Sequence, residues 1–468
     1  MEKNFYITTT LPYVNADPHL GFALEIVQAD VIARYHRLIG DKVIFNFGTD
    51  EHGQKIYQKA REENKNPKDY VDEYAAKFNK LKKALNLSYT NFIRTTDESH
   101  IKAAQKFWEI CKKNGDIYKK NYKTKYCVGC ELEKTDSELV GGKCPLHPNI
   151  ELEIIEEKNY FFRFSKYQDK LLKFYESHPD FVVPGFRFKE IKQFVEKGLK
   201  DFSISRLKEK MPWGIDVPDD PDQVMYVWFD ALINYISTLG WPEKNIDDYW
   251  PGIQLCGKDN LRQQTAIWQA MLMSANIANT KQVFVHGFIS LNGQKMSKTT
   301  GNVIYPDNLT EKYGTDSVRY YLLAHVHPIE DSDFTMEKFE KAYTADLANG
   351  LGNLVSRVTA MAQNYKISSK NPTQLTKKVE NNLKKYRFDK ALNNIWDNIS
   401  ASDSLINKTE VWSLKEDKKI TILTDLINQI RQISYDLTPF LPDTAEFINK
   451  QLSSPKIRKN KPLFPRLN

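Results

Sequence analysis

The sequence predicts an α/β fold, in which a Rossmann-type parallel sheet carries an insertion and is followed by an all-α helix bundle. Strand and helix signals alternate over residues 1–113 and again over residues 228–292, as in a parallel sheet with crossover helices. The segment between these halves, residues 114–227, has mixed patterns and holds three cysteines and a histidine at short spacings. Residues 293–345 are expected to form a connector. Residues 346–468 lack strand signals and have helical periodicity, which predicts the bundle.

The first strand and helix meet in a segment that suits a nucleotide. Residues 5–9 (FYITT) have the β-branched and aromatic content of a strand, and apolar residues then recur at helical spacing over residues 20–40. Gly21 lies in the first turn of this helix, where unpaired backbone N–H groups and a partial positive charge favour a polyphosphate. His19 adds a side-chain donor. The alternative, a solvated turn histidine, is not excluded by so short a pattern.

A second segment, residues 294–302 (QKMSKTTGN), carries two cations in a loop of small polar residues. The strand-like residues 282–287 precede it closely, so we expect the loop at the carboxyl edge of the sheet. Lys295 and Lys298 could then surround a leaving pyrophosphate. A solvated surface turn is the alternative for this segment taken alone.

Four residues have the spacing of a metal site. Cys127 and Cys130 form one knuckle, and after thirteen intervening residues Cys144 and His147 form another. Three thiolates and an imidazole are ligands that suit a tetrahedral zinc, and four protein ligands leave no open position for catalysis. The sequence therefore predicts a zinc knuckle with a structural Zn²⁺. Reduced cysteines without a metal are the alternative.

Cysteine usage and hydropathy point away from export and membranes. Five cysteines is an odd number, so we expect no disulfide framework. No segment of basic residues followed by apolar residues precedes the first strand, so we expect no secretory signal. Cys111 and Cys256 have apolar neighbours and are expected to be core residues. The most apolar stretch, residues 224–241, is interrupted by Asp230 and Asn234, which disfavours a membrane span. These features predict a cytoplasmic protein.

The net charge of +7 is concentrated at one end of the chain. Residues 346–468 contain 20 Lys or Arg against 12 Asp or Glu, so this segment carries +8 and the first 345 residues carry −1. A cationic helical segment is typical of a polyanion partner such as a nucleic acid. A solvated lysine-rich surface is the alternative.

The two loop motifs resemble the signatures of class I aminoacyl-tRNA synthetases. Five further blocks accompany them, in chain order residues 8–15 (TTTLPYVN), 48–53 (GTDEHG), 93–96 (IRTT), 227–231 (VWFDA) and 257–259 (GKD). These blocks resemble the methionyl-tRNA synthetase family, and the resemblance covers almost the whole chain.

This resemblance implies a two-step reaction. An amino-acid carboxylate attacks the α-phosphate of ATP and releases pyrophosphate, and the acyl group then passes to the 3′ end of tRNA(Met). Both steps depend on positioning and charge stabilisation. Mg²⁺ is expected with the ATP. The implied catalytic residues are His19, Lys295 and Lys298, and the implied ATP-binding residues are these three with Gly21, Gly257, Asp259 and His286.

The resemblance also implies a pocket for methionine. Asp50, at the carboxyl end of a strand, would pair with the ammonium group, and apolar and aromatic residues would surround the thioether. The implied pocket consists of Leu11, Tyr13, Asp50, Trp228, Ala231, Tyr235, Gln264 and Trp268. An ordinary core position is the alternative for each aromatic residue taken singly.

In the helical segment the resemblance implies that three residues read the tRNA anticodon. Asn353 and Arg357 are four residues apart and are expected on one face of a helix, and Trp412 is expected in a polar loop. The family carries a comparable structural zinc, one per chain, in its connective insertion. We expect a monomer, because no oligomerisation domain is apparent after the bundle.

Two positions depart from the family pattern. The first signature normally ends in a second histidine, but Phe22 stands there, and losing such a donor should cost about 2 to 4 kcal/mol of transition-state stabilisation. Gln264 stands where the family usually has a histidine beside the methionine side chain. Two alternatives therefore remain: a synthetase-derived RNA-binding or partner protein with a weakened activation site, or a synthetase with an altered amino-acid preference.

Overall fold

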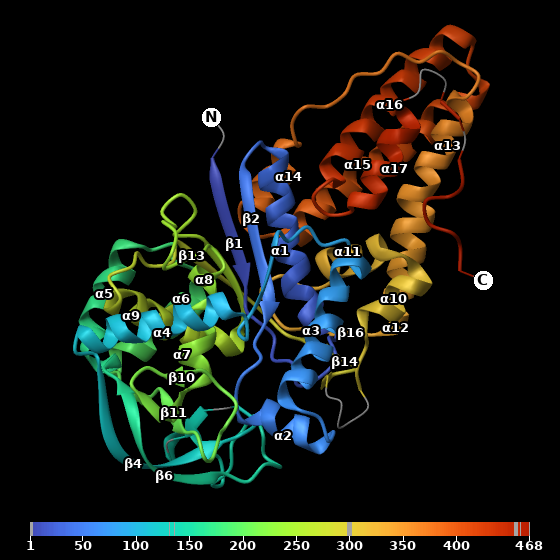
Figure 1. The fold of residues 1–468 in the computed structure, drawn as a ribbon. Helices are drawn as coiled ribbons and strands as arrows, with labels where there is room; N and C mark the ends of the chain where they lie inside the picture. Colours follow the sequence, from blue (N-terminus) through green and yellow to red (C-terminus); the bar gives the residue numbers. More distant parts are fainter. Residues whose placement is uncertain are drawn as a thin grey trace.

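A six-stranded parallel sheet forms the centre of the computed structural model, which describes residues 3–130, 132–134, 136–296, 302–453, 457–458 and 460–467 (Figure 1). The strand order is β3-β2-β1-β12-β13-β7. The strands β2 and β3 are added on one side of β1 and the later strands β12 and β13 on the other, so the order of strand addition reverses between β1 and β12. Such a switch point opens a crevice at the carboxyl ends of the strands. The strands are β1 (Asn4–Thr9), β2 (Lys42–Thr49), β3 (Asn91–Arg94), β7 (Val182–Val183), β12 (Ile253–Gly257) and β13 (Gln282–His286).

Each face of this sheet is covered by a separate hydrophobic core, as the period of two along a strand requires. Phe5 and Ile7 of β1 belong to the core that is continuous with the helix bundle, whereas Tyr6 between them belongs to the core shared with the insertion. The helices of this part are α1 (Leu20–Leu38), α2 (Gln54–Glu62), α3 (Pro67–Ala84), α4 (Glu98–Lys113), α7 (Val227–Ala231), α8 (Asn234–Ser237) and α9 (Trp268–Ser274).

The described residues of the insertion form two antiparallel sheets and two α-helices. In Figure 1 its long strands β4 and β6 lie at the opposite end of the molecule from the bundle helices α15, α16 and α17. The strand β7 lies within residues 114–227 but pairs with β13, so this segment also supplies the edge of the central sheet. The remaining elements are β4 (Ile117–Cys127), β5 (Leu132–Lys134), β6 (Glu153–Phe162), β8 (Phe202–Ser203), β9 (Ser205–Leu207), β10 (Asp216–Val217), β11 (Asp220–Met225), α5 (Gln168–Ser177) and α6 (Gly185–Glu196).

A small sheet and three helices connect the central sheet to the bundle, and the bundle itself is helical wherever it is described. A continuous helical segment leads into it through a π-helix, Tyr343–Gly352. The connector holds β14 (Ile289–Leu291), β15 (Gln294–Lys295), β16 (Ser332–Phe334), α10 (Pro306–Tyr313), α11 (Thr315–Ala324) and α12 (Met336–Ala342). The bundle holds α13 (Asn353–Ala362), α14 (Lys377–Leu383), α15 (Phe388–Thr409), α16 (Glu416–Leu437) and α17 (Pro442–Leu452). The predicted fold class is confirmed.

A buried ion pair joins the first helix of the central sheet to the connector, and the arginine of this pair also bonds to the bundle. Arg319 of α11 and Asp30 of α1 are both fully buried, and Arg319 Nη1 lies 2.8 Å from Asp30 Oδ2. The Arg319 guanidinium also donates to the backbone oxygens of Leu85, after α3, and Phe440, before α17. Burial alone would raise the pKa of Asp30, but Arg319 and Arg34 hold that pKa below its usual value.

Among the described residues, no helix has both the length and the apolar character that crossing a membrane requires.

Candidate functional site

Residues 297–301 of the segment that carries Lys295 and Lys298 are not described, but the residues on both sides of them lie against the start of α1. The Leu20 N–H donates to the Ile304 carbonyl oxygen at 2.9 Å, and a Cβ placed on Gly21 would lie 3.8 Å from the Met296 methyl carbon. Lys298 lies in residues 297–301, outside the described part of the chain, and for Lys295 only the backbone in β15 is described. Two segments almost 280 residues apart in sequence therefore meet at the switch point of the sheet.

His19 caps α1. Its Nδ1 accepts from the Gly21 N–H at 3.1 Å, so the proton of the neutral imidazole is on Nε2. A Cβ on Gly21 would lie 2.8 Å from His19 Cε1, closer than such atoms approach. The glycine thus permits the ring to fold over the helix terminus, where it can donate to an anion.

A carboxylate ties α1 to the carboxyl ends of two strands. Glu25 accepts from the Thr10 N–H at 2.7 Å, after β1, and lies 2.8 Å from His286 Nε2, at the end of β13. Burial alone would lower the pKa of His286, but the Glu25 carboxylate raises it above its usual value. In the 3₁₀ turn after the neighbouring strand β12, the Asp259 carboxylate lies over Gly257, since a Cβ on Gly257 would lie 2.7 Å from Asp259 Oδ1. The predicted residues His286, Gly257 and Asp259 are therefore close together.

Asp50 directly follows β2 and is buried. Its backbone pairs with the segment after β1: the Asp50 N–H donates to the Pro12 oxygen at 3.0 Å, and the Val14 N–H donates to the Asp50 oxygen at 3.2 Å. Tyr13, the bridge partner of Asp50, donates its hydroxyl to the His52 backbone oxygen at 2.6 Å. A carboxylate is thus held at the carboxyl edge of the sheet beside an aromatic side chain.

Gln264, Tyr235 and Trp268 form one buried contact set. Gln264 lies in a π-helix, Gln263–Ile267, and its Nε2 donates to the Tyr235 hydroxyl at 2.5 Å. The Trp268 ring lies 5.8 Å from the Tyr235 ring, edge to face. Neither Gln264 Oε1 nor Trp268 Nε1 has a hydrogen-bond partner among the described residues. Polar atoms that are buried in this way are suited to a bound ligand.

The other predicted pocket residues lie closer to the surface. Leu11, Tyr13 and Trp228 are half-buried, and Ala231 is buried on α7. Tyr13 and Trp228 pack against the same small hydrophobic cluster, and Val128 of the first cysteine knuckle packs against it too. The wall of the candidate pocket therefore rests partly on the knuckle.

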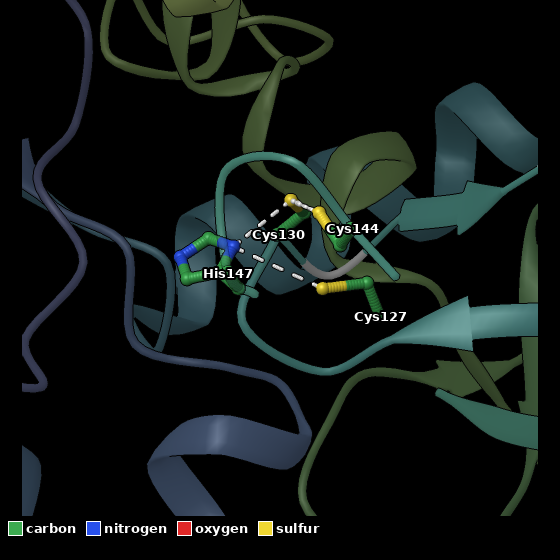
Figure 2. A group of neighbouring side chains, drawn as sticks. All are labelled: Cys127, Cys130, Cys144 and His147. Carbon is green, nitrogen blue, oxygen red and sulfur yellow. Dashed lines mark hydrogen bonds between the residues drawn. The ribbon is translucent and has the colours of Figure 1, made fainter. Parts of the chain in front are cut away.

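The four predicted metal ligands come together (Figure 2). Their donor atoms all lie within 4.8 Å of one another, with 3.4 Å between the sulfurs of Cys130 and Cys144 and 3.2 Å from Cys130 Sγ to His147 Nδ1. Two sulfurs on one tetrahedral zinc lie about 3.8 Å apart, since each Zn–S bond is about 2.3 Å. Gly129 permits the approach, because a Cβ there would lie 2.6 Å from the His147 ring. The donor set and its dimensions fit a structural metal ion such as Zn²⁺.

The predicted anticodon residues lie at one end of the bundle. Arg357 of α13 pairs with Asp403 at 3.2 Å and donates to Asn407 Oδ1 at 2.9 Å, in the last turns of α15. Trp412 follows α15 in a short 3₁₀ turn, and 55% of its surface is exposed. Asn353 is exposed one turn before Arg357. An exposed indole suits base stacking.

Sequence reasoning did not single out four buried polar residues near these sites: Glu25, His52, His100 and Asp230. His52 Nδ1 and His100 Nε2 lie 2.7 and 2.8 Å from the two carboxylate oxygens of Asp230. The available signals were the charged Glu25 on the otherwise apolar face of the first helix and the single histidine, His52, of the GTDEHG block.

Comparison with known proteins identifies the family. The family model described as tRNA synthetases class I (M) matches residues 5–151 and 149–359. A methionine–tRNA ligase of Thermotoga maritima is 42% identical over 475 residues, which cover 96% of this chain and 75% of the relative. One of Clostridium acetobutylicum is 41% identical over 509 residues, which cover 100% of this chain and 79% of the relative.

A solved structure agrees with these matches. Mycobacterium tuberculosis methionyl-tRNA synthetase in complex with methionyl-adenylate superposes with a TM-score of 0.91 at 34% identity, covering 98% of this chain and 95% of that one. Sequence, fold and the meeting of the two loop segments agree, and the chain belongs to the methionyl-tRNA synthetase family of class I aminoacyl-tRNA synthetases.

Proposed function

We propose that this chain activates methionine with ATP and transfers the methionyl group to tRNA(Met). The observation that carries the proposal is the contact of Met296 and Ile304 with the start of α1, beside the pocket that holds Asp50. Relatives of similar sequence are named methionine–tRNA ligases, and the solved relative holds methionyl-adenylate.

In this proposal the chain positions its substrates and stabilises charge. Asp50 pairs with the methionine ammonium, and the carboxylate attacks the α-phosphorus as the bond to the β-phosphate breaks. Lys295 and Lys298 neutralise the pyrophosphate, His19 donates from Nε2, and Asp259 accepts from the ribose hydroxyls. Mg²⁺ enters with ATP. A hydroxyl at the 3′ end of tRNA then attacks the acyl carbon, and AMP leaves.

Pyrophosphate exchange with a panel of amino acids tests the proposal. We expect exchange with methionine and a loss of at least about a hundredfold in kcat/KM for Asp50→Ala, because the ammonium loses its charged partner. Exchange with a different amino acid would favour an altered preference linked to Gln264. Exchange with none would favour the synthetase-derived binding protein.

We propose further that Cys127, Cys130, Cys144 and His147 hold one structural Zn²⁺ per chain. The ion would fix the knuckle against the cluster that supports Tyr13 and Trp228. The cationic bundle, with Asn353, Arg357 and Trp412 at one end, would bind the anticodon. The remaining cysteines, Cys111 and Cys256, form no disulfide, which suits the reducing cytoplasm. We expect a monomer.

Removing the metal is expected to disorder the knuckle and to weaken methionine binding, because the pocket wall loses its support. Metal analysis should give about one zinc per chain in purified protein and none after treatment with a strong chelator. Cys130→Ser should lower both zinc content and the melting temperature. Cys111→Ser, which changes a buried thiol in another core, is the matched control and should keep its zinc. Full zinc content in Cys130→Ser would contradict the assignment.

A further inference from the structure

A single buried carboxylate links several parts of the candidate methionine pocket. The side chain of Asp230 is 0% exposed, its Oδ2 lies 2.7 Å from His52 Nδ1, and its Oδ1 lies 2.8 Å from His100 Nε2. A buried charge is costly unless it is hydrogen-bonded, and these two imidazoles supply the partners. Burial alone would raise the pKa of Asp230, but His52 and His100 hold it below its usual value.

The residues of this cluster lie next to the pocket residues in sequence and in space. His52 follows Asp50 by two positions, and its backbone oxygen accepts from the Tyr13 hydroxyl at 2.6 Å. Asp230 lies on α7 between Trp228 and Ala231. One carboxylate therefore connects the segment that carries the ammonium partner to the helix that carries the apolar wall.

The hydrogen bonds also fix the protons of the two histidines. An ionised carboxylate only accepts, so His52 must present Nδ1–H and His100 must present Nε2–H. If His100 is neutral, its Nδ1 is then an acceptor for the Ser237 hydroxyl, 2.9 Å away on α8. Ser237, His100, Asp230 and His52 therefore form a continuous series of hydrogen bonds in which each donor faces an acceptor. Asp230 is the only charged acceptor among these four residues.

We propose that Asp230 and His52 are positioning residues for methionine: their hydrogen bond holds Asp50 and the Trp228–Ala231 helix at the separation that the amino acid requires. The proposal rests on the proposed methionine activation. Neither residue need touch the substrate. Their effect should therefore fall on methionine binding rather than on ATP binding.

Steady-state pyrophosphate exchange with Asp230→Asn tests this role. The amide keeps the size of the carboxylate, so we expect the fold to persist. Its single oxygen cannot accept from both imidazoles, however, and the charge-assisted bond to His52 is lost or replaced by a weaker neutral one. The methionine KM should rise about tenfold or more while the ATP KM stays within about twofold. A loss of fold stability alone would not separate the two KM values in this way.

Variants of His52 make the test independent of Asp230. In His52→Asn the amide nitrogen takes the place of Nδ1 and can still donate to Asp230, so the methionine KM should stay within about threefold of wild type. In His52→Leu the donor is lost, and the methionine KM should rise as it does in Asp230→Asn. Ser237→Ala removes the hydroxyl at the end of the hydrogen-bonded series that is farthest from His52. It is the matched control, and its methionine KM should be unchanged.

The possible outcomes separate this role from the proposed function. If wild-type protein exchanges with methionine but Asp230→Asn and His52→Leu leave the methionine KM unchanged, the positioning role is wrong and the proposed function stands. Equal losses in His52→Asn and His52→Leu would also overturn the role, because the retained donor would then not matter. A wild-type protein that exchanges with no amino acid overturns both proposals.

Discussion

Replacing Phe22 by histidine is expected to raise the rate of methionine-dependent pyrophosphate exchange by about thirty- to a thousand-fold, which corresponds to about 2 to 4 kcal/mol. Phe22 lies in the first turn of α1, with its ring 4.4 Å from the His19 ring and 5.5 Å from the Phe78 ring. A histidine at this position would add a donor beside His19, where negative charge develops on the phosphates. The measurement is kcat for exchange at saturating ATP and methionine.

Phe22→Leu is the matched control, because it stays apolar but adds no donor, and no gain in rate is expected from it. Phe22 is half-buried, so Phe22→His should lose some apolar contact and about 1 kcal/mol of stability. An unchanged or lower rate in the histidine variant, with the fold retained, would mean that another group already supplies the missing stabilisation.

Arg319→Met is expected to reduce the free energy of unfolding by about 3 to 5 kcal/mol, because it leaves a buried carboxylate without its main partner. Arg319 and Asp30 are fully buried, and the guanidinium also satisfies backbone oxygens on both sides of the interface between sheet and bundle. Urea unfolding at pH 7.5 measures the change. The variant should also lose the cooperativity between the sheet and the bundle.

The matched control is Arg187→Met. Arg187 is half-buried, but it pairs at the surface with the exposed Glu190, and this pair should contribute at most about 1 kcal/mol. The pH dependence gives a further check. In the wild type the lowered pKa of Asp30 stabilises the fold above about pH 4, the usual carboxyl range, and this contribution is lost as the pH falls. Without Arg319 the Asp30 pKa should rise, so the variant's deficit should shrink on acidification. A loss below about 1 kcal/mol at pH 7.5 would contradict this account.

Local patterns were sufficient to predict much of the fold. The strand at the N-terminus, the helix after it and the strand before the lysine segment are β1, α1 and β13, because each has a clear period and clear breakers. Cys111 and Cys256 are buried, as their apolar neighbours indicated. The four knuckle residues come together as predicted, since two short spacings restrict the possible geometries. The roles of all the site residues, zinc binding by these four included, stay predictions.

Features that depend on distant partners were not predictable from local sequence. Val182 and Val183 become a strand only because they pair with β13, and two residues carry no periodicity. Asp230 and His100 are polar residues that single-sequence reasoning assigns to the surface, and only tertiary contacts reveal them as a buried cluster. The same holds for Arg319, whose partners come from three separate segments.

The Glu25 carboxylate has a consequence for how rapidly such a site can work. In water, dipoles around ATP must rotate when charge moves onto the departing diphosphate, and that rearrangement is part of the barrier. Here the hydrogen bonds of Glu25 to Thr10 and His286 hold the N-terminus of α1 in place. The backbone N–H dipoles of that terminus are therefore already oriented when the nucleotide binds. The reorganisation has been completed during folding. A change that weakens the hydrogen bonds of Glu25 should therefore lower the turnover rate even where the loss of folding stability is too small to measure.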